Sequence, residues 1–294
     1  MKTIITTTGT SLLSNARRIL GQEKAENDDE LRHLFTRLGA EKASAETNSL
    51  LKIGTPKDQV ILLHTNTPEG TRCCQLIEQY LQGKSWKKVQ SRQLSLEENE
   101  AQFERQGLRE LVNTLIDEIN KAQRQSTEVV INATGGFKAQ IAYTTMVGMI
   151  FQVPVKYIYQ NFEQPITFPT LPVSWNIDLL LEYESFFTWL DSEPRPQNEV
   201  EQRLKAIPET ERNRISQLLL PPDTDNEVFL SAAGEILWQK LAQQRQLGEM
   251  IADPPASEIP NKDKISNSLE GVKHHYPRGT KEFAQKIAQL SAVE

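Results

Sequence analysis

The fold is decided by the stretch EVVINATGGFK, residues 128–138. Its first half, Glu128–Asn132, is a short apolar run of the kind that a strand covered on both faces shows in a parallel sheet. Its second half, Ala133–Lys138, breaks the strand with two glycines, and small and apolar residues then follow in a helical pattern to about Gln152. A buried strand, a glycine loop and a helix in this order predict one unit of an α/β domain.

The same unit recurs on both sides of this stretch. The other predicted strands are Lys2–Thr8, Gln59–Leu63, Lys88–Leu94, Pro154–Tyr159 and a hairpin partner at Ile166–Phe168. Helical patterns lie between them: at about Leu12–Leu20, over most of residues 23–58, from the loop after the second strand to about Leu81, and at Glu97–Gln123. In the last of these helices, a buried stripe is formed by Leu108, Leu111, Leu115 and Ile119. Repeated units with short loops predict a Rossmann-like, mostly parallel sheet with helices on both faces.

Ligands of such sheets bind outside the carboxyl ends of the strands, where the strand order reverses. If the first and fourth strands flank that point, the loops Gly9–Ser11 and Thr134–Gly136 lie side by side. The sequence therefore predicts that these two loops form one ligand site.

Beyond the sheet, the pattern is helical. Asn176–Leu190 predicts an apolar helix that either closes the first domain or forms a dimer interface, and Ser192–Pro196 has the composition of a linker. A helix at Glu199–Leu220, a turn, a short strand and a helix at Ser231–Arg245 resemble a winged-helix unit. We expect three regions: an α/β domain at 1–190, a helical or winged-helix-like region at 191–252, and a C-terminal segment at 253–294.

Composition limits the class of protein. The 294 residues are enough for one large domain and a smaller one. No apolar run reaches the roughly 18 residues that a bilayer span requires, and the N-terminus turns polar too early for a signal peptide. Cys73 and Cys74 are adjacent, so they cannot form the disulfide framework of a secreted protein. These features predict a cytoplasmic protein that does not enter membranes.

The formal net charge of −6 argues against a protein that binds nucleic acid in general, because the overall field repels a polyanion. A small phosphorylated ligand remains possible if local donors hold it.

The first candidate loop contains Gly9, Thr10 and Ser11 between a strand and a helix. Glycine lets the backbone approach an anion, a helix N-terminus offers unpaired amide groups, and the two hydroxyls add donors. The alternative is that Ser11 only caps the helix.

The second loop contains Thr134, Gly135, Gly136, Phe137 and Lys138. Two glycines and a cation at the carboxyl end of a strand favour an anion site. The spacing is not that of a Walker A loop, and Gly9 is not part of a GxGxxG fingerprint, which argues against a nicotinamide cofactor. Lys138 could instead be a solvated first-turn residue, but a cation there opposes the helix dipole.

His64 and Asn66 follow the second strand and could contact a base or ribose, although an ordinary turn is an equal alternative. The adjacent His274 and His275 do not have the spacing of metal ligands, so we expect no metal and no cofactor. Cys73 and Cys74 are expected in a helix, as core residues.

A short strand ending in GTSLL and a second ending in NATGGFK resemble the CRISPR-associated Rossmann-fold (CARF) family, and most closely its cyclic-oligoadenylate ring nucleases. The resemblance covers about residues 1–175. It implies a homodimer that binds a cyclic oligoadenylate, most often the tetra-adenylate, across its two-fold axis. It also implies that Ser11 and Lys138 support cleavage of the ring, which would switch off type III CRISPR antiviral signalling.

Cleavage needs no metal if each ribose 2′-hydroxyl attacks its neighbouring phosphate in line. Ser11 could then orient the 2′-hydroxyl or a phosphate oxygen, and Lys138 could stabilise the developing charge. Two alternatives stay open. The domain could be a sensor that regulates a C-terminal effector, since residues 271–283 resemble the start of a RelE-like ribonuclease, or segment 199–245 could bind DNA in a transcription regulator.

Overall fold

The computed structural model describes residues 1–96, 103–159, 162–170 and 177–250. Two compact units divide the chain, Met1–Ala242 and Gln243–Glu294, and the account below concerns the first. The predicted C-terminal segment 253–294, the histidines 274 and 275 and the RelE-like stretch lie outside the described residues.

The sheet has six strands in the order β3-β2-β1-β4-β5-β6. Their bounds are β1 Lys2–Thr8, β2 Gln59–Thr65, β3 Lys88–Leu94, β4 Glu128–Asn132, β5 Val155–Tyr157 and β6 Ile166–Phe168. The first five run parallel, and β6 pairs antiparallel with β5 as the predicted hairpin partner. The chain adds β2 and β3 on one side of β1 and then crosses to β4 on the other. The strand order therefore reverses between β1 and β4, and the predicted Rossmann-like fold is confirmed.

Successive residues of the central strands enter two different cores. On β1, Ile4 belongs to one apolar cluster and Ile5 to the other, and on β2 Leu62 and Ile61 alternate in the same way. Side chains of a strand point alternately to opposite faces, so a strand covered on both faces has to be apolar at every position. This explains the unbroken apolar runs in the sequence.

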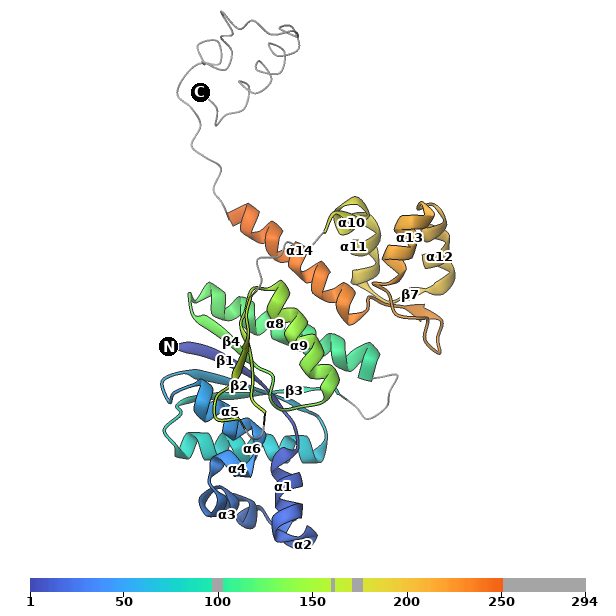
Figure 1. Cartoon of the computed structure of the whole chain (residues 1–294). Helices are drawn as coiled ribbons and strands as arrows, with labels where there is room; N and C mark the ends of the chain where they lie inside the picture. The colour runs from blue at the N-terminus through green and yellow to red at the C-terminus, as the bar shows by residue number, and fades with distance from the viewer. Residues whose placement is uncertain (97–102, 160–161, 171–176, 251–294) are drawn as a thin grey trace, which may run out of the picture. The chain divides into compact units, whose positions relative to one another are not determined.

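Helices cover both faces of the sheet, as Figure 1 shows. The first face carries α1 Ser11–Leu20, α2 Gln22–Ala25, α3 Asp28–Leu38, α4 Ala40–Ala43, α5 Ala45–Ile53 and α6 Pro68–Gly83. The second carries the π-helical turn η1 Phe103–Gly107, α8 Leu108–Arg124 and α9 Lys138–Ile150. The predicted stripe of α8 is buried, and so are Cys73 and Cys74 in α6. No helix among the described residues has both the length and the apolar composition to cross a membrane.

The remaining helices are α10 Asp178–Glu182, α11 Glu184–Ser192, α12 Gln197–Lys205, α13 Glu209–Ser216 and α14 Ala232–Met250, with the two-residue strands β7 Arg195–Pro196 and β8 Glu227–Val228 pairing antiparallel. The single helix predicted at Glu199–Leu220 is wrong: the chain forms α12 and α13, which are separated at residues 206–208 because Pro208 has no amide hydrogen to continue the first helix. A turn, a short strand and α14 follow as predicted. The domain boundaries at 190 and 252, and a DNA-binding role, stay predictions.

The single helix predicted at 176–190 is wrong in its described part, because the chain forms two short helices that break at Tyr183. Leu180 of α10 and Phe187 of α11 are buried in a cluster with residues of α12, α13 and α14. These apolar side chains therefore supply an internal core, and they are not free to form the dimer interface that the sequence suggested.

We predict that Phe187→Ala destabilises the protein by about 3–5 kcal/mol, because it empties a fully buried position. Leu181→Ala is the matched control: its side chain is 44% exposed, so we expect a change within about 0.5 kcal/mol. Urea unfolding measures both values. If Phe187→Ala were as stable as Leu181→Ala, the burial of Phe187 in an internal core would be contradicted. If Phe187→Ala lost self-association without losing stability, α11 would be an interface helix.

Candidate ligand site at the carboxyl edge of the sheet

The loops after β1 and β4 touch each other, as the sequence predicted. A Cβ atom on Gly9 would lie 2.9 Å from the backbone nitrogen of Gly136, so a larger residue has no room there. Below this contact the Thr7 hydroxyl donates a hydrogen bond to the carbonyl oxygen of Gly135 (2.6 Å). Gly136 has a φ of +95°, a conformation that disfavours other residues. The glycines of both loops are thus required by close approach and backbone geometry.

Two helices begin at this edge, and in neither does the side chain of the N-cap residue bond to the first amides. The N-cap residue of α1 is Thr10, and that of α9 is Phe137. The Gln140 side chain accepts a hydrogen bond from the Phe137 amide (2.7 Å), and no acidic residue stands in the first turn of either helix. Lys138 is the first residue of α9 and is exposed. Two converging helix N-termini and an exposed cation favour an anion.

A buried carboxylate stands behind the first loop. Glu46, in the first turn of α5, has no exposed surface. One carboxylate oxygen accepts a hydrogen bond from the Gly9 amide (2.9 Å), and the other accepts one from the Ser11 hydroxyl (2.6 Å). A Cβ atom on Gly135 would overlap the same carboxylate. Glu46 therefore joins α5 to both loops.

Ser11 is not the cap of α1, because it is the first residue inside the helix. Its hydroxyl donates to Glu46 and accepts a hydrogen bond from the Ala45 amide (3.0 Å). A hydroxyl offers one donor and two acceptor positions, so one acceptor position remains. The proposed capping role is wrong in this structure, and Ser11 links α1 to α5 instead.

The Thr134 hydroxyl is also engaged within the protein. It donates to the side-chain oxygen of Asn132 (2.7 Å) and accepts from the Ile158 amide (3.1 Å). Asn132 in turn donates to Ser49 of α5 (2.8 Å). Thr134 thus fixes the second loop to the exit of β5 and to the sheet, which makes it a positioning residue.

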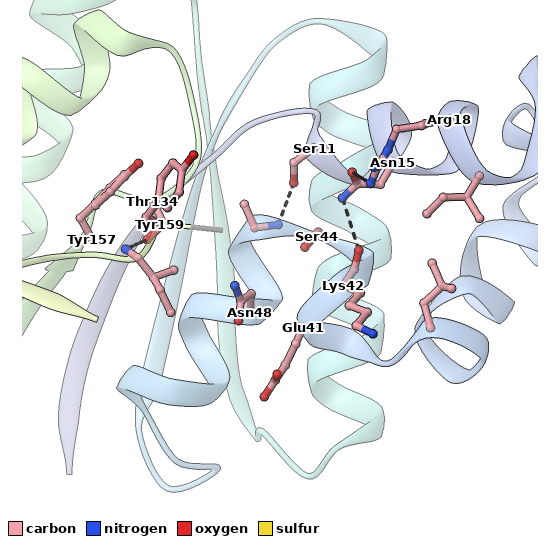
Figure 2. A pocket seen from close by; sticks show the side chains of 14 residues that line it. Ser11, Asn15, Arg18, Glu41, Lys42, Ser44, Asn48, Thr134, Tyr157 and Tyr159 are labelled. Carbon is pink, nitrogen blue, oxygen red and sulfur yellow. Dashed lines mark hydrogen bonds between the residues drawn. The ribbon is translucent and has the colours of Figure 1, made fainter. Parts of the chain in front are cut away.

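Ser11 and Thr134 line one pocket with a volume of about 560 Å³. Figure 2 shows Thr134, Tyr157 and Tyr159 on one side of it and Asn15 and Arg18 on the other. Lys42 and Glu41 of α4 and Asn48 of α5 complete the polar lining. Asn48 is only 6% exposed, and its side-chain oxygen accepts no hydrogen bond from the described residues.

The other predicted residues lie at the same edge but not in this pocket. Lys138 and Phe137 belong to the start of α9, on the face of the sheet opposite α1, and the Phe137 ring packs edge-on against Phe103. His64 was expected in a loop, but β2 continues through Thr65, so His64 is a buried strand residue beside Thr8. Asn66 is exposed, and its amide bonds to the Leu94 carbonyl (2.9 Å).

Sequence reasoning missed Glu46 and Asn48. A glutamate in the first turn of a helix has an ordinary explanation in the helix dipole, so its presence at this position carries no special signal. Its partners Gly9 and Ser11 are more than 30 residues away in the sequence, and only the folded chain brings them together.

The fold and this edge define a Rossmann-like α/β domain with a candidate anion site at its β1–β4 reversal point. Residues 41–171 match the family of the CRISPR-associated protein Cas_APE2256. This segment, less than half of the chain, is therefore similar to a CRISPR-associated family, in agreement with the resemblance. It includes Glu46 and the second loop, whereas Gly9 and Ser11 precede it.

A solved structure with a similar chain is that of Can2 from Sulfobacillus thermosulfidooxidans in complex with cyclic tetra-adenylate. The identity is 12% and the TM-score 0.30, over 88% of this chain and 71% of that chain.

We predict that Gly135→Ala destabilises the protein by about 1–3 kcal/mol, because the added methyl group meets the Glu46 carboxylate and lies 2.8 Å from the Thr7 carbonyl oxygen. Gly83→Ala is the control: it is exposed at the end of α6 with no atom within 4 Å of the new methyl group, so it should be neutral or stabilise by up to about 1 kcal/mol. Urea unfolding compares the two variants. A neutral Gly135→Ala would contradict the close packing of Glu46 against this loop.

Proposed function

We propose that the protein is a ring nuclease: it binds a cyclic oligoadenylate, with the tetra-adenylate as the first ring to test, and cleaves it without a metal. The observation that carries the proposal is the direct contact of the two predicted loops at the β1–β4 reversal point. The relation to CRISPR-associated proteins supports the choice of this ligand class over other phosphorylated molecules. In this role the protein would end type III CRISPR antiviral signalling.

Phosphate groups of the ring would lie over the start of α1 and α9. The N-terminal ends of both helices contribute their positive dipole ends, and Lys138 supplies a charge that takes part in no ion pair among the described residues. The wide carboxyl edge lets a ring contact Ser11 on one face of the sheet and Lys138 on the other.

An adenine base would enter the pocket beside Ser11. Tyr157 and Tyr159 provide aromatic surface for a base, and Arg18 and Lys42 provide positive charge near a phosphate. The buried side-chain oxygen of Asn48, which has no donor among the residues that the structure describes, would accept a hydrogen bond from the exocyclic amino group of adenine.

We propose further that two copies of the chain bind one ring. Four equivalent phosphates have a symmetry that a two-fold dimer can match with one pair of loops from each subunit. The apolar residues of α10 and α11 do not supply this interface, because they are buried within the chain.

Cleavage would proceed when a ribose 2′-hydroxyl attacks its own neighbouring phosphate in line. The protein has to hold the ribose in this alignment and stabilise the charge that develops on the phosphate oxygens. Lys138 and the positive dipole ends of α1 and α9 would supply that stabilisation.

We predict that the purified protein converts cyclic tetra-adenylate into shorter linear products at the same rate with and without EDTA, because every group in this scheme belongs to the chain or the ligand. Chromatography of the products, with cyclic hexa-adenylate as a second substrate, measures the rate. A rate that EDTA abolishes and magnesium or manganese restores would contradict this mechanism.

A sensor of the same ligand is the second candidate, and one packing feature favours it. Val147 and Ile150 of α9, the helix that starts at the ligand edge, share a core with Ala232 and Ile236 of α14. The partly buried ion pair between Arg109 and Glu235 (3.0 Å) also joins α8 to α14. A shift of α9 on binding could therefore reach the C-terminal region without cleavage.

We predict that Lys138→Ala slows single-turnover cleavage about a hundredfold or more, roughly 2–4 kcal/mol in the barrier, and weakens ligand binding much less. Ser11→Ala should also slow cleavage, through misalignment of the attacking hydroxyl. Because both residues serve one aligned state, the double variant should lose less than the product of the two effects.

The matched control is Lys121→Ala, because Lys121 is an exposed lysine at the opposite end of the sheet. This variant should change neither the cleavage rate nor the ligand affinity. Equal losses of rate and affinity in Lys138→Ala and Ser11→Ala would mean that the residues only bind the ligand, and the sensor would be the better description.

A further inference from the structure

The orientation of the Ser11 hydroxyl decides which ligand group it can contact. Its hydrogen points to Glu46, and one of its acceptor positions is occupied by the Ala45 amide. Only an acceptor position is left for the pocket. Ser11 therefore cannot donate to a phosphate oxygen in this arrangement, but it can accept a hydrogen bond from a hydroxyl group.

Glu46 stands behind Ser11 as seen from the ligand. Ser11 lines the pocket, whereas Glu46 does not and has no exposed surface. A hydrogen-bonded path therefore runs from the pocket through the Ser11 oxygen to the Glu46 carboxylate, with 2.6 Å between the two oxygens.

The environment of Glu46 differs from that of the other buried glutamates in the described part of the chain. Glu118 pairs with Arg92 (3.0 Å) and Lys121 (3.1 Å), and Glu235 pairs with Arg109 (3.0 Å). Glu46 takes part in none of the ion pairs of the described residues. Burial of a carboxylate without a cation is costly. Both oxygens of Glu46 accept hydrogen bonds, and the Ser11 hydroxyl is one of the two donors, so the carboxylate can take up the hydroxyl proton.

We propose that Glu46 is the positioning residue that receives a proton through Ser11 during cleavage, an inference that rests on the proposed ring-nuclease function. As the ribose 2′-oxygen forms its bond to phosphorus, its proton passes to the Ser11 oxygen, and the Ser11 proton passes to Glu46. The bond from phosphorus to the 5′-oxygen breaks, and that oxygen takes a proton from water. Glu46 returns its proton to water after the product leaves.

Other groups near this path can be told apart from Glu46. Cys73 and Cys74 lie close enough for the Glu46 charge to affect them, but burial raises the pKa of both thiols to about 12, so they stay neutral in acid. Glu41 lines the pocket from α4 and is exposed. Arg18 and Lys42 line it as well, and neither carries a carboxylate.

The test is Glu46→Gln in the full chain. A glutamine amide would donate to the Ser11 oxygen and turn the hydroxyl hydrogen toward the pocket. We expect the single-turnover rate with cyclic tetra-adenylate to fall about a hundredfold, within the range for general base catalysis. Affinity should stay the same or improve, because a buried negative charge near the phosphates is removed.

The pH–rate profile separates this role from a structural one. The wild-type rate should rise as an acidic group loses its proton, and this limb should vanish in Glu46→Gln. It should persist in Glu41→Gln and in Glu46→Asp, which keeps a carboxylate. Glu118→Gln removes another buried carboxylate, far from the pocket, and should leave both the rate and the profile unchanged.

The outcomes distinguish the two proposals. A wild-type protein that binds the ring but never cleaves it overturns both the ring-nuclease function and the role of Glu46. A wild-type protein that cleaves, with Glu46→Gln equal to it in rate and profile, overturns only the role of Glu46. If Glu46→Gln no longer unfolds cooperatively on heating, the pH–rate profile of Ser11→Ala tests the proposal instead. The proton transfer through Ser11 requires the acidic limb of the profile to vanish in this variant as well. A limb that persists in Ser11→Ala overturns the relay.

Discussion

The hydrogen bonds of the Glu46 carboxylate connect three parts of the chain that lie far apart in the sequence. They fix the Gly9 amide and the Ser11 hydroxyl at the start of α1, and the carboxylate itself packs against Gly135 of the second loop. The rest of the ligand edge depends on this arrangement. Without it, neither the orientation of Ser11 nor the distance between the two loops would be defined.

The polar groups of this edge have different tasks. The hydroxyls of Ser11, Thr134 and Thr7 are engaged within the protein and hold the loops in place. Groups that remain for a ligand are the exposed Lys138, one acceptor position on Ser11 and the polar lining of the pocket beside it. A site of this kind suits an anion, because Lys138 and the positive dipole ends of α1 and α9 lie at the same edge.

The two faces of the sheet differ in what they attach to the edge. The pocket with Ser11 lies on the face that carries α1, α4 and α5, where all lining elements belong to the first 160 residues. The other face carries α9, which shares its core with α14. Lys138 at the start of α9 therefore lies on the face that packs against α14, whereas the pocket with Ser11 lies on the opposite face.

The strands of the sheet and their mostly parallel order could be predicted from the sequence. Strands β1, β3, β4 and β6 were predicted with their observed bounds. The apolar runs of β2 and β4 arise because alternate residues of these strands face two cores, whereas β3 is a mostly exposed edge strand. The sequence also determined that the first and fourth loops meet, since glycine loops at strand ends are local signals and parallel order places those ends on one edge. The break at Tyr183 was not visible, because the apolar pattern on both sides of it is continuous.

The tertiary structure decided what each polar group of the edge does. Ser11 looked like either a cap or a ligand donor, and it is neither in this structure, because its hydrogen bonds go to Ala45 and Glu46 of α5. His64 looked like a loop residue, but pairing with β1 and β3 extends β2 past it. Glu46 gave no signal at all. Hydrogen bonds across more than 30 residues depend on how helices pack on the sheet, and a local pattern in the sequence does not contain that information.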